Sequence, residues 1–183
     1  MPSFSPTIET QRLILRPLSH KDAQALFGIF SDPDVMKYWI TPPWASSEEA
    51  TRYINKAIDH ARDQVALTLG IFLKETDRLI GRCALFEINS QQRRGAIGYG
   101  LDNEYWGNGY MPEAAQALLD YGFDELRLRR IEAEIDPENH ASARTLEKLG
   151  FMHEGRLRQQ WELQGRLSDS DIYGLLKTDK RHE

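Results

Sequence analysis

The segment that most constrains the fold is an apolar strand that runs into a glycine-containing loop and then into a helix, over residues 97–112. Gly107 and Gly109 allow the backbone to turn so that several N–H groups point at one place. The amino end of the following helix adds positive potential at the same place. The segment therefore predicts an anion cradle, and a pyrophosphate is its natural ligand.

Other interpretations of this loop are tested by spacing. A P-loop needs Gly-Lys-Ser/Thr at its end, and Tyr110 and Met111 follow Gly109 instead, so that class is excluded. A dinucleotide fold needs a third glycine where Pro112 stands and a parallel strand unit before the loop, so it is disfavoured even though Asp136 could serve as its acidic residue. A third interpretation, in which the glycines only make a tight loop, stays open for the segment taken alone.

Hydrophobic periodicity gives the order of the other elements. The expected strands are Ile8–Leu18, Val65–Leu73, Leu79–Ile88, Ala96–Leu101, Arg130–Ile135, Phe151–Trp161 and Ser170–Leu176, and the expected helices are Ser19–Ser31, Ser46–Ala61, Met111–Phe123 and Asn139–Leu149. The three middle strands predict an antiparallel meander, and one late strand–helix–strand crossover must make a parallel pair. We therefore expect an α/β (α+β) fold with a mixed, mostly antiparallel sheet flanked by helices. It should form a single domain over residues 8–178, with short tails at 1–7 and 179–183.

Composition narrows the class of protein further. The chain has 183 residues and is 40% hydrophobic, which suffices for one core. A net charge of -5 and a pI of ≈ 5.6 disfavour a non-specific nucleic-acid binder. The mean hydropathy of -0.56, without a long apolar run, disfavours a transmembrane helix and a membrane partner.

The cellular setting is inferred from residue types that are rare in this chain. The amino-terminal residues lack the pattern of a signal peptide, and the lone Cys83 cannot form an internal disulfide. The histidines are scattered without metal-ligand spacing. We therefore expect a cytoplasmic protein that holds no metal and that is a monomer or a homodimer.

Several short motifs follow one another in a fixed order along roughly Glu9–Thr178. They are the segments 9–16, 79–81, 97–99, 106–110, 139–142 and 147–151, with a late hairpin at 165–169. Together they resemble the GCN5-related N-acetyltransferase (GNAT) superfamily, and most closely the branch that includes the ribosomal-protein alanine N-terminal acetyltransferases. The family loop reads Gln/Arg-x-x-Gly-x-Gly/Ala and is occupied by residues 106–111, so its two ends depart from it at Trp106 and Met111 while Gly109 matches its first glycine.

The resemblance implies that acetyl-CoA is the donor and that its pantetheine lies between two splayed strands, Ile97–Leu101 and Arg130–Ile135. The small residues Ala96, Gly98 and Gly100 share one face of the first strand, which permits a bulge or close approach by a ligand. The alternative is that they only pack under a helix. The residues expected to bind acetyl-CoA are Tyr99, Leu101, Trp106, Gly107, Asn108, Gly109, Tyr110, Met111, Asn139 and Ser142.

Two residues are expected to carry the chemistry, which the resemblance implies is direct attack of an amine on the thioester. Many relatives use a tyrosine as the acid in the helix after Asn139, but Leu146 stands at the matching position. Ser142 is the substitute acid that close relatives suggest, although its hydroxyl could instead bond local backbone. Glu87, at a strand end, is the candidate base, although such a carboxylate is often only solvated. The other candidates for roles at this site are Glu132, Glu134 and Tyr99.

The acceptor is the least determined part of the prediction. Trp39, Trp44 and Trp161 are expected to wall its site, with core packing as the alternative for each. The acidic residues Glu162 and Asp169 could steer a cationic amine. A site without a strong base suits an α-amine, whose reference pKa is about 7.7–8.0, better than a lysine amine near 10.4.

These considerations favour a peptide or protein N-terminus as the acceptor. The alternatives are a small-molecule amine, such as an amino acid, a polyamine or an antibiotic, and a non-catalytic CoA-binding module.

Overall fold

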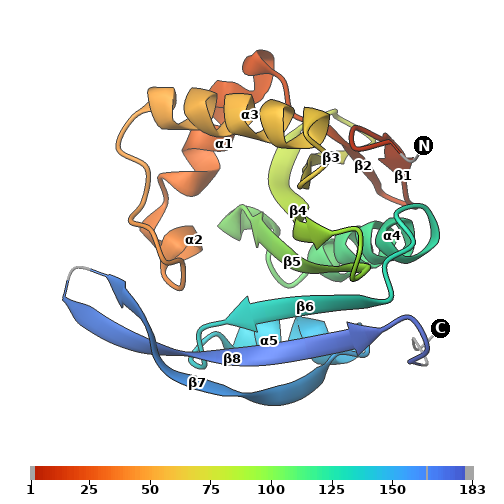
Figure 1. Ribbon diagram of the computed structural model, residues 1–183. Coiled ribbons are helices and arrows are strands. Elements are labelled where there is room, and N and C mark those ends of the chain that lie inside the picture. Colours follow the sequence, from red (N-terminus) through yellow and green to blue (C-terminus); the bar gives the residue numbers. More distant parts are fainter. Residues whose placement is uncertain (1–2, 164, 180–183) are drawn as a thin grey trace.

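The computed structural model describes residues 3–163 and 165–179, and its framework is an eight-stranded sheet (Figure 1). The strand order across the sheet is β1-β2-β3-β4-β5-β6-β8-β7. The strands are β1 (Ile8–Glu9), β2 (Leu13–Pro17), β3 (Leu67–Leu73), β4 (Leu79–Asn89), β5 (Arg94–Leu101), β6 (Arg130–Ile135), β7 (Met152–Leu163) and β8 (Arg166–Leu176). The predicted mixed, mostly antiparallel sheet is confirmed, because β5–β6 is the parallel pair and the other neighbours run antiparallel.

Helices cover both faces of the sheet. They are α1 (Ala23–Phe30), α2 (Pro33–Met36), α3 (Ser47–Arg62), α4 (Tyr110–Asp124) and α5 (His140–Lys148), with short 3-10 turns η1 (His20–Asp22) and η2 (Asn103–Tyr105). Along β4 the side chains alternate between the faces. Cys83 and Leu85 join the core under α4, whereas Arg82 faces the rings of α1 and α3. The sheet thus separates two cores, one under α4 and α5 and a second under α1–α3.

The amino-terminal segment differs from the sequence prediction. The single strand expected over Ile8–Leu18 is wrong, because the chain turns and β1 pairs back on β2, with Ile8 opposite Leu15. The reason is Thr10, whose hydroxyl accepts a hydrogen bond from the Leu13 N–H at 2.9 Å and so stabilises a turn in place of continued strand. The short helix α2, capped by Asp32, was also not predicted.

Most other boundaries agree with the prediction to within a few residues. The predicted β6 range is confirmed, and Asn139 caps α5 as expected, since its Oδ1 accepts the Ser142 N–H at 3.1 Å. Of the predicted tails, residues 1–2 and 180–183 lie outside the described residues. Among the helices that are described, none is both long and apolar enough to cross a bilayer.

The feature that positions the site is the divergence of β5 from β6. The two strands pair only over Arg94–Ala96 and Arg130–Glu132, although both continue beyond these residues. Their carboxyl ends point to the side of the molecule where α2 and the β7–β8 hairpin lie (Figure 1). The splayed parallel pair that the family resemblance implied is therefore present.

Candidate functional site

The glycine loop between η2 and α4 has the backbone that its sequence predicts. Gly107 and Gly109 have φ angles of 75° and 77°, in the left-handed region that favours glycine. Gly109 is the N-cap of α4, so the free N–H groups of the first turn of that helix follow it directly. No atom lies within 4 Å of the position that a Cβ on Gly107 would take, so the loop is open there.

Arg12 braces this loop, although no sequence pattern marked it as a site residue. Its Nη1 donates to the Asn108 carbonyl at 2.9 Å, its Nε donates to Glu113 Oε2 at 2.7 Å, and its guanidinium lies over the Tyr110 ring at 4.4 Å. Partial burial works to raise the pKa of Glu113, but hydrogen bonds from Thr10 and Arg12 outweigh it and hold that pKa below its usual value. Arg12 therefore places a fixed positive charge beside the predicted anion cradle.

The backbone of β5 presents unpaired groups to the gap beside β6. Asp102 N–H donates to the Ile80 carbonyl at 2.8 Å, one residue beyond the pair Gly81 and Leu101. Since bonding direction alternates along an antiparallel strand, the backbone groups of Tyr99 and Leu101 face away from β4, toward β6. The strand pairing with β6 has ended by then, which leaves both groups of Tyr99 and the N–H of Leu101 available to an extended ligand, while the Leu101 carbonyl accepts from the Trp106 indole.

Two of the predicted acetyl-CoA ligands use their side chains to shape the loop itself. The Trp106 indole N–H donates to the Leu101 carbonyl at 2.8 Å, although the residue is 51% exposed. The Asn108 amide donates to the Trp106 carbonyl at 3.0 Å. These bonds give Trp106 a place in the loop without the Gln or Arg of the family motif. Because both side chains are bonded within the loop, an anion would be held by the backbone N–H groups.

A buried hydroxyl, that of Tyr99 on β5, lies near the start of α5. The Tyr99 Oη is closed to solvent and has no hydrogen-bond partner within the described part of the chain. Burial raises the pKa of Tyr99 well above its usual value, and the nearby Ser142 hydroxyl offsets part of that rise without reaching hydrogen-bond geometry. An unpartnered buried hydroxyl costs about 1–3 kcal/mol, so a ligand that bonds it would recover free energy.

The helix that carries Ser142, α5, has a core leucine where many relatives have a tyrosine acid. Leu146 lies one turn beyond Ser142 on α5, and it is completely buried in the core under α4 and α5. The position that matches the family tyrosine is therefore filled by an apolar core residue. Ser142 and Tyr99 are the hydroxyls that the structure brings together here.

The three candidate base residues differ in how they are engaged. Glu132 accepts from Arg130 at 2.7 Å, and Glu134 accepts from the Trp161 indole at 2.6 Å. Glu87 is exposed, has a left-handed φ of 52°, and lies where the β4–β5 register shifts. Its carboxylate has no ion pair or hydrogen bond among the described residues, so it is free to accept a proton.

The small-residue face of β5 is covered by aromatic rings. Phe86 lies 3.1 Å from the position that a Cβ on Gly98 would take, and Trp39 lies 3.0 Å from the corresponding position on Gly100. The β4–β5 register runs without a shift past both glycines, so the bulge that they permitted is absent from this part of the strand. Sequence spacing could not indicate Phe86, because its role depends on strand pairing.

The structure brings together two of the three predicted acceptor-site tryptophans. Trp39 and Trp44 both pack on Phe30, with ring centroids 5.5 Å and 5.2 Å away, so both also belong to the second core. Trp161 lies on β7 and bonds Glu134, the penultimate residue of β6. Of the acidic hairpin residues, Asp169 accepts the Gln159 N–H at 2.8 Å.

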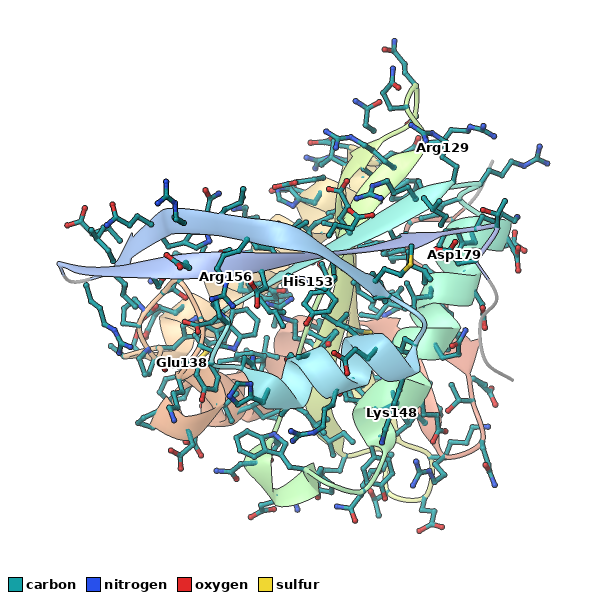
Figure 2. The ribbon with its side chains drawn as sticks, turned by 90° about the horizontal axis from the view of Figure 1, so that it is seen from below. Arg129, Glu138, Lys148, His153, Arg156 and Asp179 are labelled. Atoms are coloured by element: carbon teal, nitrogen blue, oxygen red, sulfur yellow. The ribbon has the colours of Figure 1, made fainter. Side chains whose placement is uncertain are left out.

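No group of three or more His, Cys, Asp or Glu residues within 3–163 and 165–179 is arranged to hold a metal ion. The β7–β8 hairpin carries an ion-paired cluster instead, around the nearly buried Asp171. Arg156 donates to both oxygens of Asp171, at 2.7 and 2.9 Å, and His153 lies 3.3 Å from the same carboxylate. Figure 2 shows His153 and Arg156 on one face of the β7–β8 hairpin, with α5 alongside.

The splayed strands, the glycine loop and the buried hydroxyl together suit an extended ligand that ends in phosphates. The family model of the "Acetyltransferase (GNAT) domain" matches residues 12–152. The chain therefore belongs to the GNAT acetyltransferases, and it is an acetyl-CoA-dependent N-acetyltransferase.

Individual relatives support the same assignment. The chain is 40% identical over 173 residues to the "Uncharacterized N-acetyltransferase p20" of Bacillus licheniformis, a match that covers 94% of this chain and 97% of that protein. It resembles the crystal structure of the spermidine N-acetyltransferase from Vibrio cholerae in complex with CoA and spermine, with 26% identity, a TM-score of 0.82, and 93% and 98% of the two chains covered.

A further structure shares the fold alone. The chain resembles RimJ from Mycobacterium smegmatis in complex with CoA-disulfide with 23% identity and a TM-score of 0.88, over 96% of this chain and 90% of that one.

Proposed function

We propose that this enzyme acetylates a primary α-amine, and that the acceptor is the N-terminus of a peptide or protein. The observation that carries the proposal is the engagement of the carboxylates near the splayed strands. Glu132 and Glu134 are bonded to Arg130 and Trp161, which leaves the exposed Glu87 as the free candidate base. An α-amine, with a reference pKa of about 7.7–8.0, is partly neutral near pH 7.5 and needs no stronger base.

The residues present fit acetyl-CoA as the donor. The left-handed glycines, the first turn of α4 and the charge of Arg12 suit the pyrophosphate. The outward-facing backbone groups of Tyr99 and the Leu101 N–H suit the amides of the pantetheine. Ser142, at the start of α5, lies beside the buried Tyr99 hydroxyl, and Asn139 caps the same helix, so this helix end suits the thiol end of the donor.

In the mechanism that we propose, acetyl-CoA supplies an acetyl group activated as a thioester. The Tyr99 backbone N–H donates to the carbonyl oxygen as negative charge develops on it. As the new N–C bond forms and the C–S bond breaks, the Ser142 hydroxyl, supported by Tyr99, provides a proton to the departing sulfur and regains one from solvent. Glu87, directly or through water, takes the proton that the attacking nitrogen loses. No covalent bond to the enzyme is made.

The proposed acid is not required to be strong. A thiol has a reference pKa of about 8.5, so a departing thiolate is already a tolerable leaving group near neutral pH. Burial holds the Tyr99 hydroxyl in its protonated form, because the pKa of Tyr99 is raised. Tyr99 can therefore donate a hydrogen bond to Ser142 or to the sulfur throughout the reaction, which explains how a serine could replace the absent tyrosine acid.

The similarity to spermidine acetyltransferases supports polyamines as the competing acceptor class. The two are distinguished by a panel of N-terminal peptides, free amino acids, polyamines and aminoglycosides at matched concentration, followed by intact-mass location of the acetyl group. We expect efficient transfer to peptide α-amines. Transfer to polyamines or aminoglycosides with every peptide inert would refute this acceptor class and leave the acetyl-CoA assignment standing.

A further inference from the structure

A nearly buried arginine lies inside a cage of aromatic rings on the α1–α3 side of the sheet. Arg82 is on β4 and is 9% exposed. Its guanidinium carbon lies 4.6 Å from the ring centre of Trp39, 5.2 Å from that of Tyr53 and 5.5 Å from that of Phe30. These rings come from α1, from α3 and from the segment after α2, so three parts of the chain converge on one cation.

Among the described residues this cation has no anionic partner. The carboxylates of residues 3–163 and 165–179 form their ion pairs with other cations, and none lies within 4.0 Å of the Arg82 guanidinium. Arginine is almost never buried unless it is paired. Contact with ring faces offsets part of the desolvation cost but supplies no counter-charge. Arg82 is therefore a buried charge without a counter-charge in the part of the chain that the structure describes.

The guanidinium is still reachable. Within the described residues, the Tyr99 hydroxyl is the side-chain polar atom that is both closed to solvent and without a hydrogen-bond partner. The nitrogens of Arg82 make no hydrogen bond and are not in that class, so each keeps some access to solvent. A small anion, or an anionic group on a larger molecule, can therefore reach them.

The location ties this cation to the acceptor side of the site. Arg82 pairs with Gly100 of β5, and the Trp39 ring that lies over Gly100 is also the nearest ring to the guanidinium. Arg82 thus stands one strand away from the splayed edge, on the sheet face opposite α4. Tyr99, Ser142 and α5 approach from the other direction, so the acceptor and the donor would meet at the end of β5.

We propose that Arg82 binds a carboxylate of the acceptor, so that the substrate is an amine that carries a carboxylate close to its reacting nitrogen. This inference rests on the proposed acetyl transfer to an α-amine. The planar guanidinium can bond both oxygens of a carboxylate, and the rings hold it in place for that contact. The carboxylate belongs either to the acceptor's own α-carboxyl group, as in a free amino acid, or to an acidic side chain near a peptide N-terminus. A polyamine would bring a second cation to a buried one.

The test compares acceptors that differ in a single carboxylate. Alanine against alanine amide examines the α-carboxylate, and the peptide pair Ala-Asp-Ala-Ala-amide against Ala-Asn-Ala-Ala-amide examines the side chain. We expect kcat/KM for the acid to exceed that for its amide by about tenfold or more in one of the two pairs, as a charge-assisted bidentate bond would give. The responding pair identifies the source of the carboxylate.

Variants then show whether Arg82 causes the preference. In Arg82→Met the acid-to-amide ratio should fall toward one, chiefly through KM, while the affinity for CoA stays unchanged. Arg82→Lys keeps the charge but loses the paired donors, so it should retain a smaller preference. A purely structural arginine would lower activity on both members of a pair equally. If Arg82→Met does not fold, the acid-to-amide ratios of the wild type and of Arg82→Lys still test the role of Arg82.

Failure of this inference is distinguishable from failure of the proposed function. Equal rates on acid and amide, with α-amines still acetylated, would overturn the role of Arg82 and leave the acceptor class intact. A preference for γ-aminobutyrate over every α-amine, lost in Arg82→Met, would refute the α-amine and support Arg82. Exclusive use of polyamines would overturn both.

Discussion

Gly109 offers the sharpest test of the anion cradle, because Asp and Asn at this position differ in charge but hardly in shape. We compare Gly109→Asp with Gly109→Asn, which have nearly the same size and which both tolerate a left-handed φ better than other side chains do. The φ of Gly109 is 77°, and a Cβ there would lie 3.5 Å from the Arg12 Nη2. A carboxylate at this position would both face the proposed pyrophosphate site and pair with Arg12, which braces the loop.

The magnitude follows from Coulomb's law. Two unit charges about 5 Å apart interact by roughly 1 kcal/mol at the dielectric constant of water and by about 3 kcal/mol at an effective value of 20. Partial pairing with Arg12 favours the lower half of that range. We therefore expect Gly109→Asp to bind CoA at least about tenfold more weakly than Gly109→Asn does, which is about 1.4 kcal/mol.

Calorimetric titration with CoA measures this difference, and salt provides a second signature. The Debye length falls from about 10 Å at 0.1 M to about 3 Å at 1 M, so the gap between the two variants should narrow at high salt. Gly165→Asp is the matched control, since its φ of 78° and its open surroundings impose the same backbone strain at the β7–β8 turn. It should bind CoA as the wild type does. Equal CoA affinity of folded Gly109→Asp and Gly109→Asn would refute the placement of phosphates at this loop.

Three further predictions concern single side chains. Tyr99→Phe removes a buried hydroxyl that has no hydrogen-bond partner among the described residues, so the free energy of unfolding in urea should be unchanged or higher by up to about 1 kcal/mol while kcat falls. A loss of stability would contradict the assigned geometry. Cys83 is completely buried, and burial raises its pKa to about 12, so the folded protein should react with a thiol reagent only after denaturant is added, and rapid native labelling would show that the strand is open. Arg156→Met should lower the thermal midpoint at neutral pH, because the Arg156 hydrogen bonds hold the pKa of Asp171 below its usual value. The stability that this lowered pKa contributes is fully present above the unfolded pKa of about 3.9 and is lost as the pH falls from there through the lower pKa of the folded state. The thermal midpoints of the variant and the wild type should therefore converge over that range. A difference in midpoint that does not depend on pH would exclude the ion pair as its cause.

The sequence by itself determined those parts of the molecule whose causes are local. Glycines at 107 and 109 take the left-handed conformation that glycine allows more readily than other residues do, and Asn139 caps the helix that follows it. The change from a period of two to a helical period located β4, β5 and α4, and the late crossover required the parallel pair β5–β6. Motif order along the chain was enough to indicate the GNAT family.

Tertiary structure decided which distant residues meet. Arg12 reaches Asn108 and Glu113 across about a hundred residues of sequence, and no spacing rule connects them. The cage around Arg82 exists only because β4 passes beneath rings from three other segments. Local propensity reflects neighbours along the chain, whereas charge pairing, burial and the orphaned Tyr99 hydroxyl depend on which groups folding leaves close together and which it leaves without a partner.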